Sequence, residues 1–243
     1  MRIGYKLCSE ERDPSGLIDD ARSAEEVGFD FAAISDHFHP WTDRQGQSPF
    51  VWSALGGIAA VTDRITIGTA VTCPTVRMHP ALIAQAAATI ACMLPGRFFL
   101  GVGTGERLNE HIFGDPWPSI STRRAMLREA VEILRRRWTG ELITYGGEYF
   151  SIDGARIYTR PDRRIPVYLA AGGPEAASLA AEIGDGLIAS GGSQETIDAF
   201  EVEGGTGPRL AEVLVDADDD EERALARLRD RWPTPAIPGE LSA

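Results

Sequence analysis

Strand-like and helix-like runs alternate along most of this chain, and this alternation restricts its fold more than any other feature of the sequence. Short apolar runs such as 66–71 are followed by longer runs with helical spacing, such as 80–94. Helices that return the backbone between strands in this way are typical of a parallel sheet, so the sequence predicts an α/β fold. The predicted strand and helix pairs are 2–6 with 14–27, 30–34 with 50–61, 66–71 with 80–94, 97–102 with 121–138, 165–171 with 174–183, 185–190 with 194–202, and 210–215 with a helix from 218.

One segment breaks the alternation after the fourth helix. Residues 142–152 form two alternating arms around Gly146 and Gly147, a pattern typical of a β-hairpin. We therefore expect a small hairpin inserted between two units of the sheet. The proline-rich residues 232–243 are expected to be irregular, and a single domain is predicted over 1–243.

The number of βα units remains open in this prediction. A closed barrel of eight units needs one strand more than the seven listed above, and an open barrel leaves the backbone of its first and last strands unpaired. Three explanations are possible: a shortened chain, an eighth strand that the pattern does not reveal, or closure by another subunit.

The composition narrows the class of protein. A chain of 243 residues that is 43% hydrophobic can bury a sizeable core without disulfides or metal. Cys8, Cys73 and Cys92 are odd in number and form no CxxC pair, which predicts reduced thiols in the cytoplasm and no structural zinc. No run approaches the roughly 20 apolar residues of a membrane helix. A net charge of -12 argues against a nucleic-acid partner.

Polar side chains directly follow two of the predicted strands. The second strand is followed by Asp36, His37 and Trp41, and the fourth by a glycine-rich segment that ends in Glu106. Because the carboxyl ends of parallel strands open on one face of a sheet, His37 and Glu106 are expected on the same face. A histidine and a carboxylate there form a candidate site for proton transfer.

With these segments located, the chain resembles the bacterial luciferase-like superfamily, in the branch of F420-dependent oxidoreductases similar to F420-dependent glucose-6-phosphate dehydrogenase. The resemblance extends from Arg2 to about Ile188 and rests on short motifs in the right order. They are Gly4-Tyr5-Lys6, Ser35-Asp36-His37-Phe38 with Pro40-Trp41, Gly68-Thr69, Pro74-Thr75, Gly101-Val102-Gly103-Thr104-Gly105-Glu106 with Leu108-Asn109-Glu110, and Ala170-Ala171-Gly172-Gly173-Pro174. The resemblance implies a (β/α)8 TIM barrel, here without its last βα unit, that binds the deazaflavin coenzyme F420 at the C-terminal ends of its strands.

The resemblance also implies roles for individual residues. His37 matches the family's catalytic base, Glu106 the acid that protonates the reduced ring, and Trp41 the aromatic side chain that orients the substrate. Asp36 and Asn109 match contacts to the ring or the pocket. These roles suit the chemistry, because an alcohol must lose its hydroxyl proton to a base as the hydride leaves. A carboxylate can protonate the coenzyme where an apolar pocket raises its pKa.

Further coenzyme contacts follow from the same resemblance. The family has a non-proline cis peptide behind the ring, and the matching bond here is Ala70–Val71. The family also binds the coenzyme's phosphodiester near a helix start, where glycines offer free amides. The other predicted contacts are Cys73, Gly172, Gly173, Ser190 and Gly191.

The chain departs from the glucose-6-phosphate enzymes where they bind the sugar phosphate. Those enzymes use basic residues, one just after the sixth strand and others in the C-terminal quarter. Ser193 stands at the first position here, and the later positions have no match. Because no cationic clamp is visible, the sequence gives no basis for phosphate binding. We therefore predict hydride transfer with a small alcohol-like or aldehyde-like substrate, whose identity stays open.

Two other functions are weighed against this prediction. One is an FMN-dependent monooxygenase of the same superfamily, which the matches at Trp41 and Glu106 disfavour. The other is a shortened, inactive paralogue that binds deazaflavin or a partner subunit without turnover. A homodimer is predicted, because the family often dimerises and a dimer would cover an incomplete barrel.

Two local patterns have simpler interpretations than a metal site. His37-x-His39 could bind zinc or iron, but the other histidines, His79 and His111, have no supporting carboxylate at a strand end, so no metal is predicted. The acidic run 216–222 is interpreted as the solvated start of a helix rather than a cation site.

Overall fold

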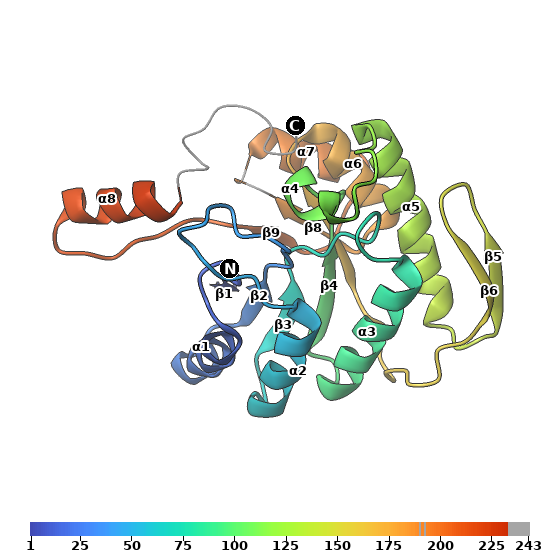
Figure 1. Ribbon diagram of the computed structural model, residues 1–243, viewed down its shortest axis with the longest axis horizontal. Coiled ribbons are helices and arrows are strands. Elements are labelled where there is room, and N and C mark those ends of the chain that lie inside the picture. Colours follow the sequence, from blue (N-terminus) through green and yellow to red (C-terminus); the bar gives the residue numbers. More distant parts are fainter. Residues whose placement is uncertain (190, 192, 233–243) are drawn as a thin grey trace.

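The computed structural model describes residues 1–189, 191 and 193–232, and its centre is a curled parallel sheet (Figure 1). The strand order is β1-β2-β3-β4-β7-β8-β9, and every neighbouring pair is parallel. The strands are β1 (Gly4–Leu7), β2 (Phe31–Ile34), β3 (Thr66–Thr69), β4 (Phe98–Val102), β7 (Val167–Ala171), β8 (Gly186–Ala189) and β9 (Arg209–Ala211). The predicted α/β fold with seven parallel strands is confirmed.

The helices between these strands also lie where the sequence predicts them. They are α1 (Pro14–Val27), α2 (Val51–Val61), α3 (Pro80–Met93), α5 (Ile120–Arg137), α6 (Pro174–Ile183) and α7 (Gln194–Val202). Local signals explain their ends. The side chain of Asp13 accepts a hydrogen bond from the Gly16 amide at the start of α1, and Gly28 adopts a left-handed conformation, φ 92°, at its end.

The core lies between the sheet and these helices, and β4 is buried along its whole length. A close approach of β4 to β3 depends on Gly101, because a Cβ atom there would lie 2.0 Å from the carbonyl oxygen of Thr69. The Thr69 hydroxyl donates to the Gly101 carbonyl at 2.8 Å. The segments that follow β3 and β4 therefore leave the sheet side by side, and a bridge between Thr72 and Val102 continues the contact.

The inserted hairpin is confirmed. Its strands β5 (Ile143–Gly146) and β6 (Ser151–Ala155) pair antiparallel, and the second strand continues past the predicted end at 152. Glu129 of α5 anchors the turn, because its carboxylate accepts hydrogen bonds from the amides of Tyr149 and Phe150. The hairpin stands beside α5, away from the strand ends (Figure 1).

The structure differs from the prediction at one strand end and in the segment between β4 and α5. The strand predicted over 210–215 ends at Ala211, which pairs with Ala189, the last residue of β8. Between β4 and α5 lie the short helix α4 (Arg107–Glu110) and the 3-10 turn His111–Phe113, which the sequence pattern did not predict. Such short elements have too few residues for a hydrophobic period to show.

The acidic run near the C-terminus is paired with its own helix, α8 (Glu221–Arg231). The helix begins after 218, because the Asp220 side chain caps the amides of Glu222 and Arg223. Asp216 and Asp218 form ion pairs with Arg227. The helix extends away from the sheet (Figure 1). The predicted irregular segment lies, from 233 onward, outside the described residues.

The sheet brings its two edge strands close to each other. Lys6 of β1 and Glu212, which follows β9, form an ion pair with 2.9 Å between Nζ and Oε2. Among the described residues these strands have no backbone pairing with each other. The structure therefore matches a barrel that lacks one unit, as predicted.

Candidate active site

A cavity of about 420 Å³ opens at the C-terminal ends of the strands. Its volume is in the range of small-molecule sites. Predicted site residues that line it are Asp36, His37, Trp41, Ala70, Val71, Cys73, Glu106, Asn109 and Gly191. Gly172 and Gly173 lie beyond its wall, between β7 and α6, where Gly173 is the N-cap. Ser190 lies outside the described residues.

A second hollow, of about 450 Å³, lies on the outer surface between α5 and α6. Its charged side chains are engaged with one another in the ion pairs Arg124–Glu175 and Arg128–Glu182. The strand ends therefore hold the better candidate for chemistry.

His37 lies between two carboxylates. Its Nε2 is 4.0 Å from Glu106 Oε2, and its Nδ1 is 3.0 Å from Glu10 Oε1. Nδ1 and the Glu10 oxygen are close enough for an ion pair, but the angle between them does not suit a hydrogen bond. The ring of Trp41 packs edge-to-face on the imidazole, with 4.8 Å between centroids. These contacts hold the imidazole with Nε2 toward Glu106.

The pKa shifts of this pair suit a base and an acid. Burial lowers the pKa of His37, and the negative charge of Glu10 opposes this in part, so the imidazole is neutral at neutral pH. Burial, together with the charges of Glu10 and Glu110, raises the pKa of Glu106 to about 7. The Glu106 side chain is 36% exposed as a whole, but its Oε2 atom is buried and has no hydrogen-bond partner within the described structure. This oxygen can therefore hold a proton close to neutral pH.

Asn109 connects the segment that carries His37 to the segment that carries Glu106. Its Oδ1 accepts hydrogen bonds from the amides of Phe38 and His39, at 2.8 and 3.0 Å. Asn109 belongs to α4, and Glu106 is the N-cap of that helix. The amide side chain therefore positions the predicted base relative to the predicted acid.

Glu10 is a site residue that the sequence reasoning missed. It follows β1 and is 2% exposed, and its Oε2 accepts a 2.7 Å hydrogen bond from the Ser35 hydroxyl. Its position after a strand was the available signal, since the same rule located His37 and Glu106. Lys6 and Arg77 were missed as well; Lys6 donates to the Ala70 carbonyl at 2.9 Å.

The wall formed by the segment after β3 has the predicted backbone feature. The bond Ala70–Val71 is cis, as expected from the resemblance. Cys73 is buried beside it, with Sγ 3.0 Å from the Thr75 hydroxyl oxygen. Burial raises the pKa of this thiol to about 12, so it contributes a neutral wall.

The histidines do not converge on a metal. The ring of His39 turns away from His37, donates from Nδ1 to the Leu108 carbonyl at 2.9 Å and stacks on His111. Over residues 1–189, 191 and 193–232 no group of three His, Cys, Asp or Glu side chains could hold a metal ion. In the same part of the chain, none of the helices has the length and apolar character needed to cross a membrane.

The cavity fits a flat heterocyclic coenzyme. Small and apolar residues form much of its wall, and at Gly103 a Cβ atom would approach Val71 Cγ2 to 2.8 Å. The unpartnered oxygen of Glu106 lies on the same cavity and can donate to or accept from a polar ring atom. The residues that would hold the ring are Ala70, Val71, Gly103, Ala170 and Ile188.

The model of the luciferase-like monooxygenase family matches residues 1–237. The chain belongs to this family. Among the sequence relatives of this luciferase-like protein is the F420-dependent glucose-6-phosphate dehydrogenase of Gordonia bronchialis. It is 40% identical over an alignment 253 residues long, and this alignment covers 98% of the chain and 75% of the relative. The protein with the same name from Intrasporangium calvum is 47% identical over 195 residues, covering 79% of the chain and 58% of the relative. The chain thus spans between about half and three quarters of these relatives.

Solved structures agree with this assignment. One structure is described as an F420-dependent secondary alcohol dehydrogenase in complex with an F420-acetone adduct. It has a TM-score of 0.94 and 34% sequence identity, and the match covers 100% of the luciferase-like chain and 77% of the solved chain. The coenzyme F420 dependent tetrahydromethanopterin reductase from Methanopyrus kandleri has a TM-score of 0.78 at 24% identity, covers 92% of the chain and 69% of its own, and supports the fold alone. The predicted resemblance to luciferase-like F420-dependent oxidoreductases is confirmed.

Proposed function

We propose that this luciferase-like chain is an oxidoreductase that moves a hydride between coenzyme F420 and a small neutral alcohol or its carbonyl product. The observation that carries the proposal is the approach of His37 Nε2 to Glu106 Oε2, 4.0 Å apart on one cavity. A neutral base and a carboxyl with a pKa of about 7 meet there. Both sequence relatives and the most similar solved structure described above are named as F420-dependent dehydrogenases.

Each side chain has a separate task in this proposal. Coenzyme F420, when bound, supplies the ring carbon that accepts or returns the hydride. His37 Nε2 takes the hydroxyl proton of the alcohol, and the carboxylate of Glu10 stabilises the positive charge that the imidazole then gains. Glu106 holds a proton at Oε2 on the coenzyme side. Trp41 packs against His37 and limits the orientations that a small substrate can adopt.

The charges around the cavity support a neutral substrate. Lys6 and Arg77 are cations on or beside its wall, and both are engaged by carboxylates, Lys6 by Glu212 and Arg77 by Asp36 and Glu110. Ser193 offers no charge where the glucose-6-phosphate enzymes have a basic residue. A phosphate dianion among these carboxylates would meet repulsion without a free cation among the residues that line the described cavity. The solved relative named as a secondary alcohol dehydrogenase is consistent with this class of substrate.

The experiment is a titration of the purified chain with oxidised F420 and, separately, with FMN, followed by coenzyme fluorescence. Turnover is then measured with F420 and either 2-propanol or glucose 6-phosphate. We expect tight binding of F420, weak binding of FMN, and reduction of F420 by the neutral alcohol only. Turnover of glucose 6-phosphate would contradict the substrate class. FMN binding with reduction of dioxygen would favour a monooxygenase, and no binding of either coenzyme would favour the inactive paralogue.

We further propose that the chain is a homodimer and is located in the cytoplasm. The edge strands β1 and β9, each paired on one side only within the described residues, support the dimer, and the free thiols Cys8, Cys73 and Cys92 support the location. Sedimentation equilibrium at micromolar concentration tests the dimer, and a mass of one chain, 26.3 kDa, would contradict it.

A further inference from the structure

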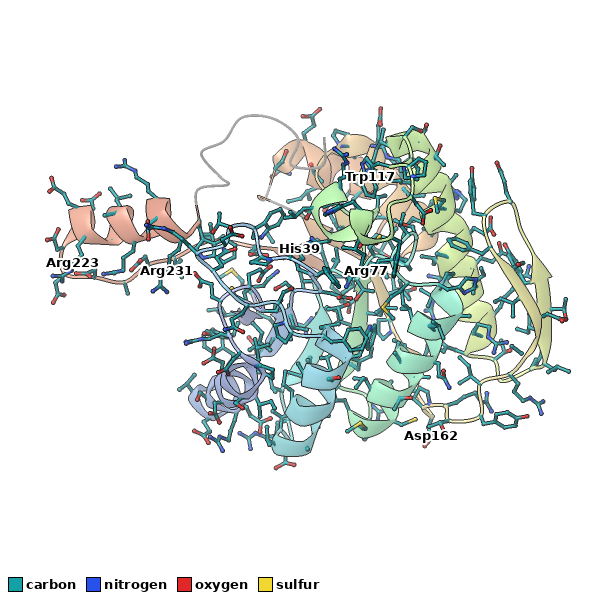
Figure 2. All side chains as sticks on the ribbon, in the orientation of Figure 1. His39, Arg77, Trp117, Asp162, Arg223 and Arg231 are labelled. Atoms are coloured by element: carbon teal, nitrogen blue, oxygen red, sulfur yellow. The ribbon has the colours of Figure 1, made fainter. Side chains whose placement is uncertain are left out.

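Arg77 is a buried cation among three segments that meet at the cavity. It lies in the segment after β3, and its side chain is 7% exposed. Figure 2, in the orientation of Figure 1, labels its position below the short helix α4. Its Nη2 donates to Oδ1 and to the backbone oxygen of Asp36, at 2.9 and 3.1 Å. Its backbone amide donates to Glu110 Oε2 at 2.7 Å, and its Nε lies 3.4 Å from Glu110 Oε1.

The two carboxylates that Arg77 joins are neighbours of the proposed base and acid. Asp36 precedes His37 in the chain, and its second oxygen accepts a 2.8 Å hydrogen bond from the Thr72 hydroxyl. Glu110 is the last residue of α4, whose N-cap is Glu106. The carboxylates of Asp36 and Glu110 are 1% exposed. Arg77 therefore links the backbone just before the base to the short helix just after the acid.

We infer that Arg77 is a positioning residue, which holds His37 at its working distance from Glu106 by joining Asp36 to Glu110. The inference rests on the proposed function for the roles of His37 and Glu106. Arg77 itself touches neither the imidazole nor the Glu106 carboxyl through any of these hydrogen bonds, so it acts through the two segments.

The chemistry of the side chain suits this role. A planar guanidinium presents several donors in fixed directions, whereas a lysine ammonium is a point charge on a flexible stem. A displacement of about 1 Å between reacting groups can cost about 100-fold in rate. Lysine at this position would keep the positive charge but lose the fixed directions toward Asp36 and Glu110. Arg77→Lys therefore removes the geometry alone, whereas Arg77→Gln removes both the charge and the geometry.

The charge of Arg77 also affects the pKa of His37, and this effect can be measured separately. The charged groups that act on His37 are Glu10, Lys6, Asp36 and Arg77, with Glu106 facing Nε2. Among them Arg77 contributes to lowering the pKa of His37. Removal of its charge raises that pKa, so the imidazole stays protonated to higher pH and the acidic limb of the activity profile moves to higher pH.

The test compares Arg77→Gln with Arg77→Lys. The matched control is Arg97→Gln, which removes a guanidinium that donates to the carbonyls of Ile65 and Thr62 at the opposite end of the sheet. Each variant is measured for kcat, for F420 affinity, for the pH profile, and for the titration of the His37 imidazole by NMR. Four histidines are present, and His37→Gln assigns the signal.

We expect kcat to fall about 10- to 100-fold in Arg77→Gln and in Arg77→Lys, with F420 affinity changed by less than about threefold. The His37 titration should move to higher pH in Arg77→Gln and stay in place in Arg77→Lys and in the control. Wild-type kcat in both variants overturns the inference. If Arg77→Gln does not fold, kcat of Arg77→Lys decides. If the wild type shows no turnover, the proposed function fails, and the distance between His37 Nε2 and Glu106 Oε2 in a crystal structure of Arg77→Lys decides the role of Arg77: a distance unchanged from 4.0 Å overturns the inference.

Discussion

Oε1 of Glu10 lies 3.0 Å from Nδ1 of His37, on the side of the imidazole opposite to Glu106. The carboxylate is itself fixed by the Ser35 hydroxyl at 2.7 Å. A negative charge at this place stabilises a protonated imidazole and leaves Nε2 free toward the cavity. The geometry therefore places one carboxylate behind the base and another in front of it.

Glu10→Gln is expected to lower kcat by about 10- to 100-fold, in the range of general acid–base effects. The carboxylate raises the pKa of His37 against the effect of burial, so its loss lowers that pKa further and moves the acidic limb of the profile to lower pH. The kinetic pH profile of the variant measures both effects. Glu26→Gln, on the exposed side of α1, is the control. A limb that moves to higher pH would count against this role of Glu10.

His37→Ala is expected to abolish F420 reduction by the alcohol while sparing coenzyme affinity, because proton removal is needed only for the chemical step. Single-turnover kinetics and fluorescence titration measure the two quantities. His111→Ala removes an exposed imidazole from the 3-10 turn after α4 and should keep most of the activity. Normal turnover in His37→Ala would exclude this residue as the base.

Periodicity predicted the sheet and its long helices because a buried face repeats along each element. The same reasoning located His37 and Glu106, since both directly follow a buried strand. Glu10 follows β1 and obeys the same rule, although it was overlooked. Arg77 could not be found in this way, because its role depends on contacts with Asp36 and Glu110, which are far from it in the chain.

Arg123 shows a second limit of the periodic pattern. Arg123 is charged, yet it lies one turn before Leu127 on the buried face of α5, is 3% exposed and stacks on the ring of Trp117, 4.2 Å from the centroid. Trp117 belongs to the irregular segment before α5, whose path no period predicts. A charged side chain near the start of a buried helix face can thus be covered by a loop, which the hydrophobic period does not reveal.

Replacement of two glycines by alanine should change the free energy of unfolding in opposite directions. Gly56→Ala in α2 meets no atom within 4 Å, so we expect it to stabilise the fold by about 0.5 to 1 kcal/mol. Gly101→Ala would place Cβ 2.0 Å from the Thr69 carbonyl oxygen and should destabilise by about 1 to 3 kcal/mol or more. Urea unfolding of both variants measures the difference. Equal effects would mean that the approach of β4 to β3 is not limited by Gly101.

Of the two residues in the ion pair between the sheet edges, Lys6 should contribute more to the free energy of unfolding than Glu212. Glu212→Gln removes one partner of a partly exposed ion pair and should change the unfolding free energy by less than about 1 kcal/mol. Lys6→Met also leaves the Ala70 carbonyl without its charged donor and should cost about 1 to 3 kcal/mol. Chemical unfolding at matched ionic strength compares them. A larger loss in Glu212→Gln would show that the ion pair dominates.

Glu106→Gln should change the pH dependence of stability. Burial and the charges of Glu10 and Glu110 raise the pKa of Glu106 from about 4.5 to about 7 in the folded chain. Below pH 4.5 the carboxyl is protonated in both states and contributes no difference. Between pH 4.5 and 7 the unfolded chain releases its proton while the folded chain keeps it, so stability falls as the pH rises, and the loss is complete above pH 7.

Glutamine carries no charge, so this loss should be absent from the variant. The melting temperature of Glu106→Gln minus that of the wild type should therefore grow by roughly 2 to 4 °C from pH 5 to pH 8 and then stay level. Calorimetry at pH 5, 6, 7 and 8 measures the difference, with the exposed Glu141→Gln as control. A difference that does not change with pH would mean that Glu106 is ionised at pH 5, and it would then hold no proton to deliver at neutral pH.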